Sequence, residues 1–289
     1  MIDIGQVLVN SLVTASIYLL AGIGLTLTIA LSRFANFAYA ELITLGAYCG
    51  LFFLLGEGGN IFLALVLAFF VVGLISVISY SVVFKPLEQR KTSLIHLMVA
   101  SIALGFVLRY SIGEIWGWSV LSYQSSWDVY TIGSVRITGL WVLMIATAFL
   151  VALLLHVFLT RTKGGKAIRA IACNPDLASI TGINKQKVIF LVWFCGAGLA
   201  AIAGIFRAAD TRLSPMMGWE LILPVFATVI LGGIGNFYGL IVAAFIIGLV
   251  ENFGVVVLLK LGLSAEYRMA IVFFILIAVL IIRPKGLAR

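Results

Sequence analysis

Long apolar runs, separated by short polar stretches, follow one another along almost the whole chain. The runs long enough to cross about 30 Å of hydrocarbon lie near 7–31, 39–56, 61–84, 94–112, 139–160, 188–206, 237–259 and 268–283. A ninth stretch near 220–236 is shorter, carries Pro224 and ends in a group of glycines. The pattern predicts an all-α polytopic transmembrane bundle with about eight or nine crossings, in one domain over 1–289, with a short or broken helix near 220–236.

The composition agrees with a membrane protein. Of the 289 residues, 63% are hydrophobic and 10% are charged, whereas soluble domains average about 25% charged residues. So few charges cannot cover a surface in water. The stretch before Arg33 holds Asp3 and no basic residue, so we expect the first apolar run to remain as a helix rather than to be a cleaved signal peptide.

The basic residues gather beside the apolar runs, and their placement predicts an orientation. The net charge is +8, but basic residues next to membrane spans follow the positive-inside rule, which explains them better than nucleic-acid binding does. Three basic clusters, at 85–91, 161–187 and 283–289, fall on one side only if the stretch near 220–236 also crosses. We therefore expect about nine crossings, with the N-terminus outside and the C-terminus in the cytoplasm.

The central basic cluster, 161–187, has the pattern of two short helices joined by a cap. Gly164 and Gly165 are expected to end the preceding span, and the run KAIRAIAC then places Lys166 and Arg169 on one face of a short amphipathic helix. We call residues 161–187 the elbow and expect it to lie in the cytoplasm.

The second helix of the elbow is marked at both ends. Asn174 is a good N-cap and Pro175 suits the first helical position. Asp176 is favoured by the positive end of a helix, and Gly182 suits the C-cap. A basic loop lying on anionic lipid is one interpretation. Such a loop needs no built caps, so the pattern favours an element that docks on another chain.

The longest stretch assigned to the outside, about 113–138, is rich in Trp and Tyr. These rings favour the membrane–water boundary, so interfacial anchoring explains them. A surface that receives an extracytoplasmic partner is the second interpretation.

Polar side chains inside hydrocarbon cost roughly 3 kcal/mol for a charge, and they tend to line an internal path or to pair. The candidates for a translocation path are Asn36, Glu41, Asn236 and Glu251. Asn36 and Asn236 each precede a Phe and an apolar span, so both are expected to break a helix beside a polar cavity, as in transporters built from repeats. Arg109 is expected to pair with Glu114, about one helical turn away, or to extend to the interface.

The sequence carries none of the catalytic motifs that membrane enzymes or ATPases use. It contains no GxxxxGK[ST] phosphate loop, no HExxH and no GxSxG. Its 3 Cys lack metal-ligand spacing, and its 2 His lie far apart. The chain is therefore expected not to be an enzyme and to bind no cofactor or metal. If it moves a solute by ATP hydrolysis, another chain must hold the ATPase site.

Five stretches of the chain stand in a recognisable order. They are SIYLLAGIGLTLTIALSRFANFAYAELITLGAY (16–48), GKAIRAIACNPDLASITGINKQKVI (165–189), AGLAAIAG (197–204), ATVILGGIGNFYGLIVAAFIIGLVE (227–251) and IRPKGL (282–287). Together they resemble the LivH-type permease of the branched-chain amino acid ABC importers over nearly the whole chain.

The resemblance implies a permease subunit in a bacterial or archaeal cytoplasmic (inner) membrane. It implies four kinds of partner: a homologous LivM-type permease, two cytoplasmic ATPase subunits that bind ATP and Mg²⁺, an extracytoplasmic solute-binding protein, and membrane lipid. The elbow looks like the family's coupling helix, seated on an ATPase subunit. The positions that match the coupling pattern are Arg169, Asn174, Pro175, Asp176 and Gly182.

The chain departs from the family in one place that bears on the path. Tyr39 and Ala40 stand where many members carry His-Gly before the acidic residue, here Glu41, and Tyr39 joins the path candidates. Urea and other amide importers use similar permeases, so they remain an alternative. An ion-coupled secondary transporter is a further one, with Glu41 and Glu251 as its candidate ion ligands.

Overall fold

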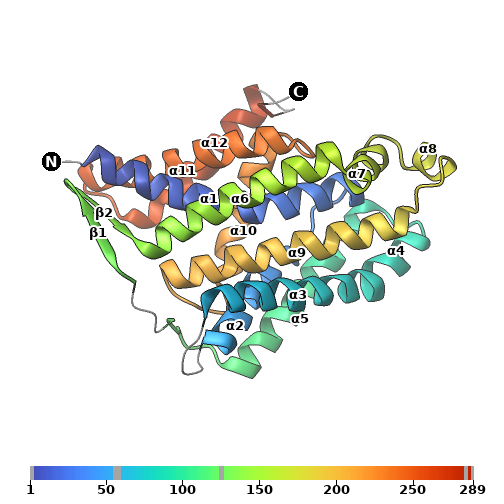
Figure 1. Cartoon of the computed structure of the whole chain (residues 1–289), viewed down its shortest axis with the longest axis horizontal. Coiled ribbons are helices and arrows are strands. Elements are labelled where there is room, and N and C mark those ends of the chain that lie inside the picture. Colours follow the sequence, from blue (N-terminus) through green and yellow to red (C-terminus); the bar gives the residue numbers. More distant parts are fainter. Residues whose placement is uncertain (1–2, 55–59, 124–126, 283–285, 288–289) are drawn as a thin grey trace.

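The computed structural model describes residues 3–54, 60–123, 127–282 and 286–287. Within these residues nine apolar helices run mostly along one axis (Figure 1): α1 Ile4–Ser32, α2 Tyr39–Leu54, α3 Ile61–Ser79, α5 Leu94–Trp116, α6 Gly139–Arg161, α9 Lys185–Asp210, α10 Met217–Gly232, α11 Phe237–Lys260 and α12 Arg268–Ile282. By length and composition, 6 of the helices are able to cross a membrane, while α2, α10 and α12 are shorter. The all-α polytopic bundle is thereby confirmed.

The centre of the bundle is formed by α1 and α9. The carboxylate of Asp3 caps α1 by accepting the amides of Gly5 and Gln6, and the residues of α1 from Ala15 to Thr28 are all buried. Helix α1 packs against α9 and α11, and α9 also packs against α2 and α3. By contrast, α3, α5, α6 and α12 expose large apolar side chains. Such outward apolar faces mark helices that meet hydrocarbon or another protein.

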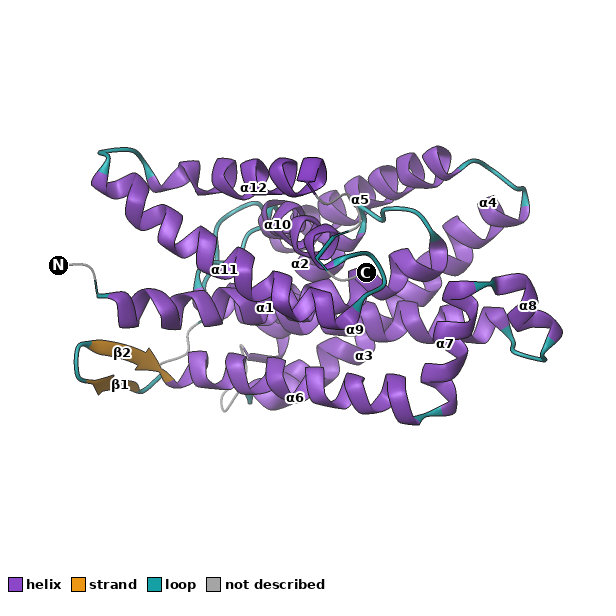
Figure 2. Cartoon of the chain, turned by 90° about the horizontal axis from the view of Figure 1, so that it is seen from above, coloured by secondary structure: helices purple, strands orange, loops and turns teal. Residues whose placement is uncertain are grey.

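Several of the connections lie at two opposite ends of the bundle (Figures 1 and 2). One end carries the N-terminus, the α11–α12 turn and an antiparallel hairpin of β1 (Val129–Ile132) and β2 (Val135–Thr138). We call it the hairpin end. The opposite elbow end carries α4 (Lys85–Gln89), which continues α3 through the π-helical turn Tyr80–Phe84, and the two elbow helices.

The hairpin was not predicted from the sequence. It lies within the aromatic segment 113–138, and Gln6 of α1 holds it in place by accepting the Arg136 amide at 2.9 Å and donating to the Arg136 carbonyl at 3.1 Å. The two strand runs flank Gly133-Ser134, a two-residue connection typical of a hairpin, and the contact with Gln6 attaches the hairpin to α1.

Two short helices, α2 and α10, meet inside the bundle. Each has 16 residues and so a length of about 24 Å, less than the thickness of the hydrocarbon. The Gly218 amide donates to Thr44 Oγ1 at 3.0 Å, and a Cβ on Gly218 would lie 1.9 Å from the carbonyl oxygen of Ala40. Only glycine permits this approach. The stretch predicted near 220–236 is thus a mostly buried helix followed by a break at 233–236.

The elbow contains the two predicted helices, α7 (Lys163–Cys173) and α8 (Pro175–Ile180). The predicted break at Gly164 and Gly165 is wrong, because both glycines lie inside α7. The chain turns at Thr162 instead, whose backbone is extended and whose hydroxyl accepts the Gly165 amide at 3.0 Å. Thr162 thus ends α6 and caps the N-terminus of α7, while the two glycines remain helical.

Candidate functional site

The ends of α8 are built as the sequence predicted. Asn174 Oδ1 accepts the amides of Asp176 and Leu177, both at 3.1 Å, and Pro175 occupies the first helical position. Gly182 has φ +83°. Its amide donates to the Ser179 carbonyl at 3.1 Å, and the next amide donates to the Ala178 carbonyl at 3.1 Å. This pair of bonds is the Schellman motif, which needs a left-handed residue at this position.

The tip of the elbow exposes apolar side chains. Leu177 is 60% exposed and Ile180 is 82% exposed, beside the exposed carboxylate of Asp176. Buried Ala178 and Ile171 attach the elbow to the rest of the protein. A rigid projection that carries apolar residues within a basic segment has the composition of a docking surface.

A cavity of about 880 Å³ lies beneath the elbow, between α1, α6, α7 and the break at 233–236. Arg169 of α7 and Asn236 of the break both line it. At its wall Tyr238 Oη lies 2.8 Å from His156 Nδ1. The structure thus brings together Arg169, predicted as a coupling residue, and Asn236, predicted as a path residue. We call this space the elbow cavity.

The two Asn-Phe pairs have the same structural task. Asn36 Oδ1 accepts the Ala38 amide at 3.1 Å just before α2, and Asn236 Oδ1 accepts the Gly239 amide at 2.9 Å at the start of α11. Asn36 is only 2% exposed, and Asn236 opens to the elbow cavity. The predicted helix breaks are confirmed; the break at Asn36 is buried, while the break at 233–236 is partly exposed. Their role in a path stays a prediction.

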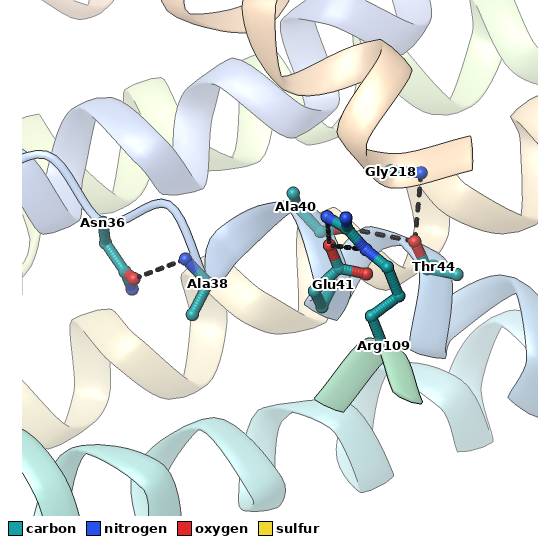
Figure 3. Close-up of polar contacts among 7 residues, drawn as sticks. All are labelled: Asn36, Ala38, Ala40, Glu41, Thr44, Arg109 and Gly218. Carbon is teal, nitrogen blue, oxygen red and sulfur yellow. Dashed lines mark hydrogen bonds and ion pairs between the residues drawn. The ribbon is translucent and has the colours of Figure 1, made fainter. Parts of the chain in front are cut away.

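Glu41 and Arg109 form a buried ion pair in which Arg109 Nε lies 3.0 Å from Glu41 Oε1 (Figure 3). The guanidinium also lies over the ring of Trp219 on α10, 4.8 Å from its centroid. The predicted pairing of Arg109 with Glu114 is wrong. Gly105 packs on Ala38 of the segment leading into α2, so Arg109, four residues later on the same face of α5, turns toward Glu41, while Glu114 is exposed.

Tyr39 lies at the contact of the two central helices. It is 1% exposed, and its hydroxyl donates toward the carbonyl oxygens of Ala21 at 2.8 Å and Gly196 at 3.0 Å. The hydroxyl therefore joins α1 to α9. Its role in a path stays a prediction.

Glu251 is the second acid within the bundle, and it too is paired. It accepts a hydrogen bond from the Tyr18 hydroxyl, and its Oε1 lies 3.6 Å from Nε of Arg268. The pairing residues Tyr18, Arg109, Trp219 and Arg268 were not among the predicted site residues. They come from other helices, and their spacing along the chain gives no signal. Among the described residues, no group of 3 or more His, Cys, Asp or Glu is placed to hold a metal ion.

Comparison with known proteins covers almost the entire chain. Residues 7–280 match the sequence profile of the family described as branched-chain amino acid transport system, permease component. The chain is 30% identical, over 99% of its length and 93% of the relative's, to a probable branched-chain amino acid transport permease protein LivH of Methanocaldococcus jannaschii. It is 27% identical to the high-affinity permease protein LivH of Escherichia coli K12, over 98% of this chain and 94% of that one.

The fold also resembles a solved structure. The similarity is to PsaBC from Streptococcus pneumoniae in complex with Fab, with a TM-score of 0.52 and 15% identity, over 96% of this chain and 91% of that chain. At this identity the likeness concerns the fold.

Proposed function

The chain belongs to the family of branched-chain amino acid transport permease components, and from that premise we propose that it is the membrane permease subunit of an ATP-driven importer for branched-chain or related amino acids. The observation that carries the proposal is the family match over 7–280. The capped elbow, which projects from a bundle of membrane-spanning helices, is the structural feature that agrees with it.

We propose that the elbow docks on an ATPase subunit. The exposed Leu177 and Ile180 would enter an apolar groove on that subunit, while the caps at Asn174 and Gly182 keep α8 rigid. Two such subunits would bind ATP and Mg²⁺, and this chain would bind neither. In this proposal Arg169, Pro175 and Asp176 act in coupling rather than in chemistry.

Helix α10 offers a route for movement between the elbow and the interior. The break that follows it lines the elbow cavity opposite Arg169. At its other end, Gly218 bonds Thr44 and Trp219 stacks on Arg109. A displacement of α7 would reach α10 through α1, which packs against both helices, and would pass from α10 to α2 and α5. This is how we expect closure of the ATPase dimer to alter the solute path.

The positions of the remaining partners are inferred from the two ends of the bundle and from its exposed apolar sides. We propose that the elbow end, with Lys85 and Arg90 in and after α4, faces the cytoplasm, and that the hairpin end faces outside and receives a solute-binding protein. A homologous LivM-type permease would cover part of the exposed apolar sides, with lipid on the rest. With these partners, we propose the bacterial or archaeal cytoplasmic membrane as the location of the protein.

The pairing of the acids inside the bundle supports this proposal over ion-coupled transport. Glu41 and Glu251 were the candidate ion ligands, and each is held by an arginine. An arginine in that position competes with a coupling cation. A urea or amide importer of the same family is distinguished by substrate tests.

The proposal is tested by purifying the tagged chain in mild detergent and identifying what accompanies it. We expect two ATPase subunits and a second permease, and ATP hydrolysis stimulated by a binding protein loaded with leucine. The double substitution Leu177→Ser and Ile180→Ser should remove the ATPase subunits but leave the second permease. Ser179→Ala, on the same short helix, is the matched control. Retention of the ATPase by the double variant would count against the elbow as its docking site.

A further inference from the structure

A second, smaller cavity lies at the hairpin end. It has a volume of about 290 Å³ and is lined by Arg207, Thr211, Arg212, Ser214, Met217, Glu220 and Arg268. These residues come from the last turn of α9, the α9–α10 connection, the first turn of α10 and the start of α12. Asp210, at the end of α9, accepts a hydrogen bond from the Trp141 indole at 2.7 Å, which fixes this region beside α6. We call this space the hairpin-end cavity.

The charges around the hairpin-end cavity are unequal. Three arginines face one carboxylate, Glu220, and Arg268 is shared with Glu251. Within the part of the chain that the structure describes, Arg207, Arg212 and Glu220 form no ion pair. The N-terminus of α10 adds its partial positive charge at Met217. The cavity therefore presents a surplus of positive charge together with a single free acid.

We propose that the hairpin-end cavity is a receiving site for a zwitterionic α-amino acid. The guanidinium groups of Arg207 and Arg212 bind its carboxylate, because planar guanidinium groups suit a carboxylate, and Glu220 binds its ammonium group. Met217 supplies apolar wall for the side chain. The volume of about 290 Å³ lies just below the range of about 300–1,000 Å³ that is typical of small-molecule sites, which suits a ligand as small as a single amino acid.

This inference rests on the proposed function and adds to it a contact site for the solute. Urea and other neutral amides carry no charge for three arginines and a glutamate to recognise. An α-amino acid carries both a negative carboxylate and a positive ammonium group. The floor of the cavity is the first turn of α10, one residue from the Gly218–Thr44 bond and two from the stacking of Trp219 on Arg109. A bound amino acid thus touches the helix that leads to the elbow cavity.

The test measures binding of three leucine analogues to the assembly that copurifies with this chain, held in nanodiscs without a binding protein. The probes are L-leucine, 4-methylpentanoate, which lacks the ammonium group, and L-leucinamide, which lacks the carboxylate. Arg207→Gln or Arg212→Gln should lower the affinity for leucine and for 4-methylpentanoate by about tenfold, which is the effect of losing one charge-assisted hydrogen bond. The affinity for leucinamide should stay unchanged. Glu220→Gln should lower the affinity for leucine and for leucinamide and leave the affinity for 4-methylpentanoate unchanged.

Arg136→Gln is the matched control, because Arg136 is an exposed arginine of the hairpin that does not line the cavity; it should change none of the three affinities. Arg212 is exposed, so its variant tests the site even where Arg207→Gln does not fold. Unchanged leucine binding in Arg212→Gln and Glu220→Gln overturns the proposal, and so does an equal loss of affinity for all three probes in each variant. Leucine uptake by the complete wild-type assembly would in either case leave the proposed function standing.

Discussion

At the scale of single residues, the interior depends on pairs that join distant helices. Glu41 is fully buried, with one carboxylate oxygen bonded to Arg109 and the other without a hydrogen-bond partner. A charge left alone in such a place is costly. The stacking of Arg109 on Trp219 ties the pair to α10. The pair is thus a joint between α2, α5 and α10.

Arg109→Met is therefore expected to lower the free energy of unfolding by about 3–5 kcal/mol, because it leaves Glu41 buried without its partner. The double variant Glu41→Gln with Arg109→Met should recover part of that loss. Denaturant titration in detergent measures both. The control is Glu114→Gln, which alters an exposed side chain; if it destabilised the protein as much as Arg109→Met, the assigned pairing would be refuted.

Tyr39→Phe removes one hydroxyl and tests whether this residue packs helices or contacts solute. The loss of its hydrogen bonds to Ala21 and Gly196 should lower the free energy of unfolding by about 0.5–1.5 kcal/mol. The KM for uptake should stay unchanged, because the hydroxyl bonds to backbone between α1 and α9. A raised KM without a loss of stability would restore Tyr39 to the path.

At the scale of elements, caps decide where helices begin and end in this chain. Asp3, Thr138, Thr162, Asn174 and Asn236 each accept a backbone amide at a helix N-terminus. Asn36 is buried, and its side chain accepts the Ala38 amide in the turn before α2, where an unsatisfied amide could not turn to water. Short polar side chains therefore make it possible to start helices within the bundle.

Gly182→Ala tests the rigidity of the elbow. The added Cβ meets nothing within 4 Å, so the cost is the left-handed backbone alone, about 1–2 kcal/mol. We expect α8 to fray and solute-stimulated ATP hydrolysis to fall, while insertion into the membrane is unchanged. Gly262→Ala carries the same kind of cost at φ +73° in the α11–α12 turn and should leave hydrolysis unaffected. Equal losses of ATP hydrolysis in both variants would show a general effect of the strained backbone rather than an effect specific to the elbow.

At the scale of the whole molecule, the distribution of charge and the arrangement of the elements both distinguish the two ends of the bundle. The elbow, the basic turn after α4 and the exposed Cys173 lie at one end, and the N-terminus and the hairpin lie at the other. Of the C-terminal basic cluster at 283–289, only Gly286 and Leu287 are among the described residues. There the Leu287 amide donates to the Leu231 carbonyl at 2.8 Å, near the end of α10.

The three native cysteines allow the orientation to be measured. Cys173 is exposed on α7, whereas Cys49 and Cys195 are half-buried in the bundle. A membrane-impermeant maleimide should label Cys173 in inside-out vesicles and not in right-side-out vesicles, and Cys173→Ser should abolish that labelling. Thr131→Cys in the exposed hairpin should show the opposite dependence. Labelling of Cys173 from the outside would reverse the assigned orientation.

The sequence by itself determined the features whose causes are local. Apolar length fixes the helices, because hydrocarbon requires about 20 apolar residues. Asn174, Pro175 and Gly182 fix the ends of α8, and Asn36 and Asn236 fix the two breaks, because a cap bonds its own next residues. Tertiary structure alone decided the contacts between helices. The pairing of Arg109 with Glu41, the closure of the hairpin on Gln6 and the approach of Arg268 to the cavity lined by Arg207, Arg212 and Glu220 join residues far apart in sequence. Helix packing, which chooses the face that each helix turns inward, has no signature in the spacing of one sequence.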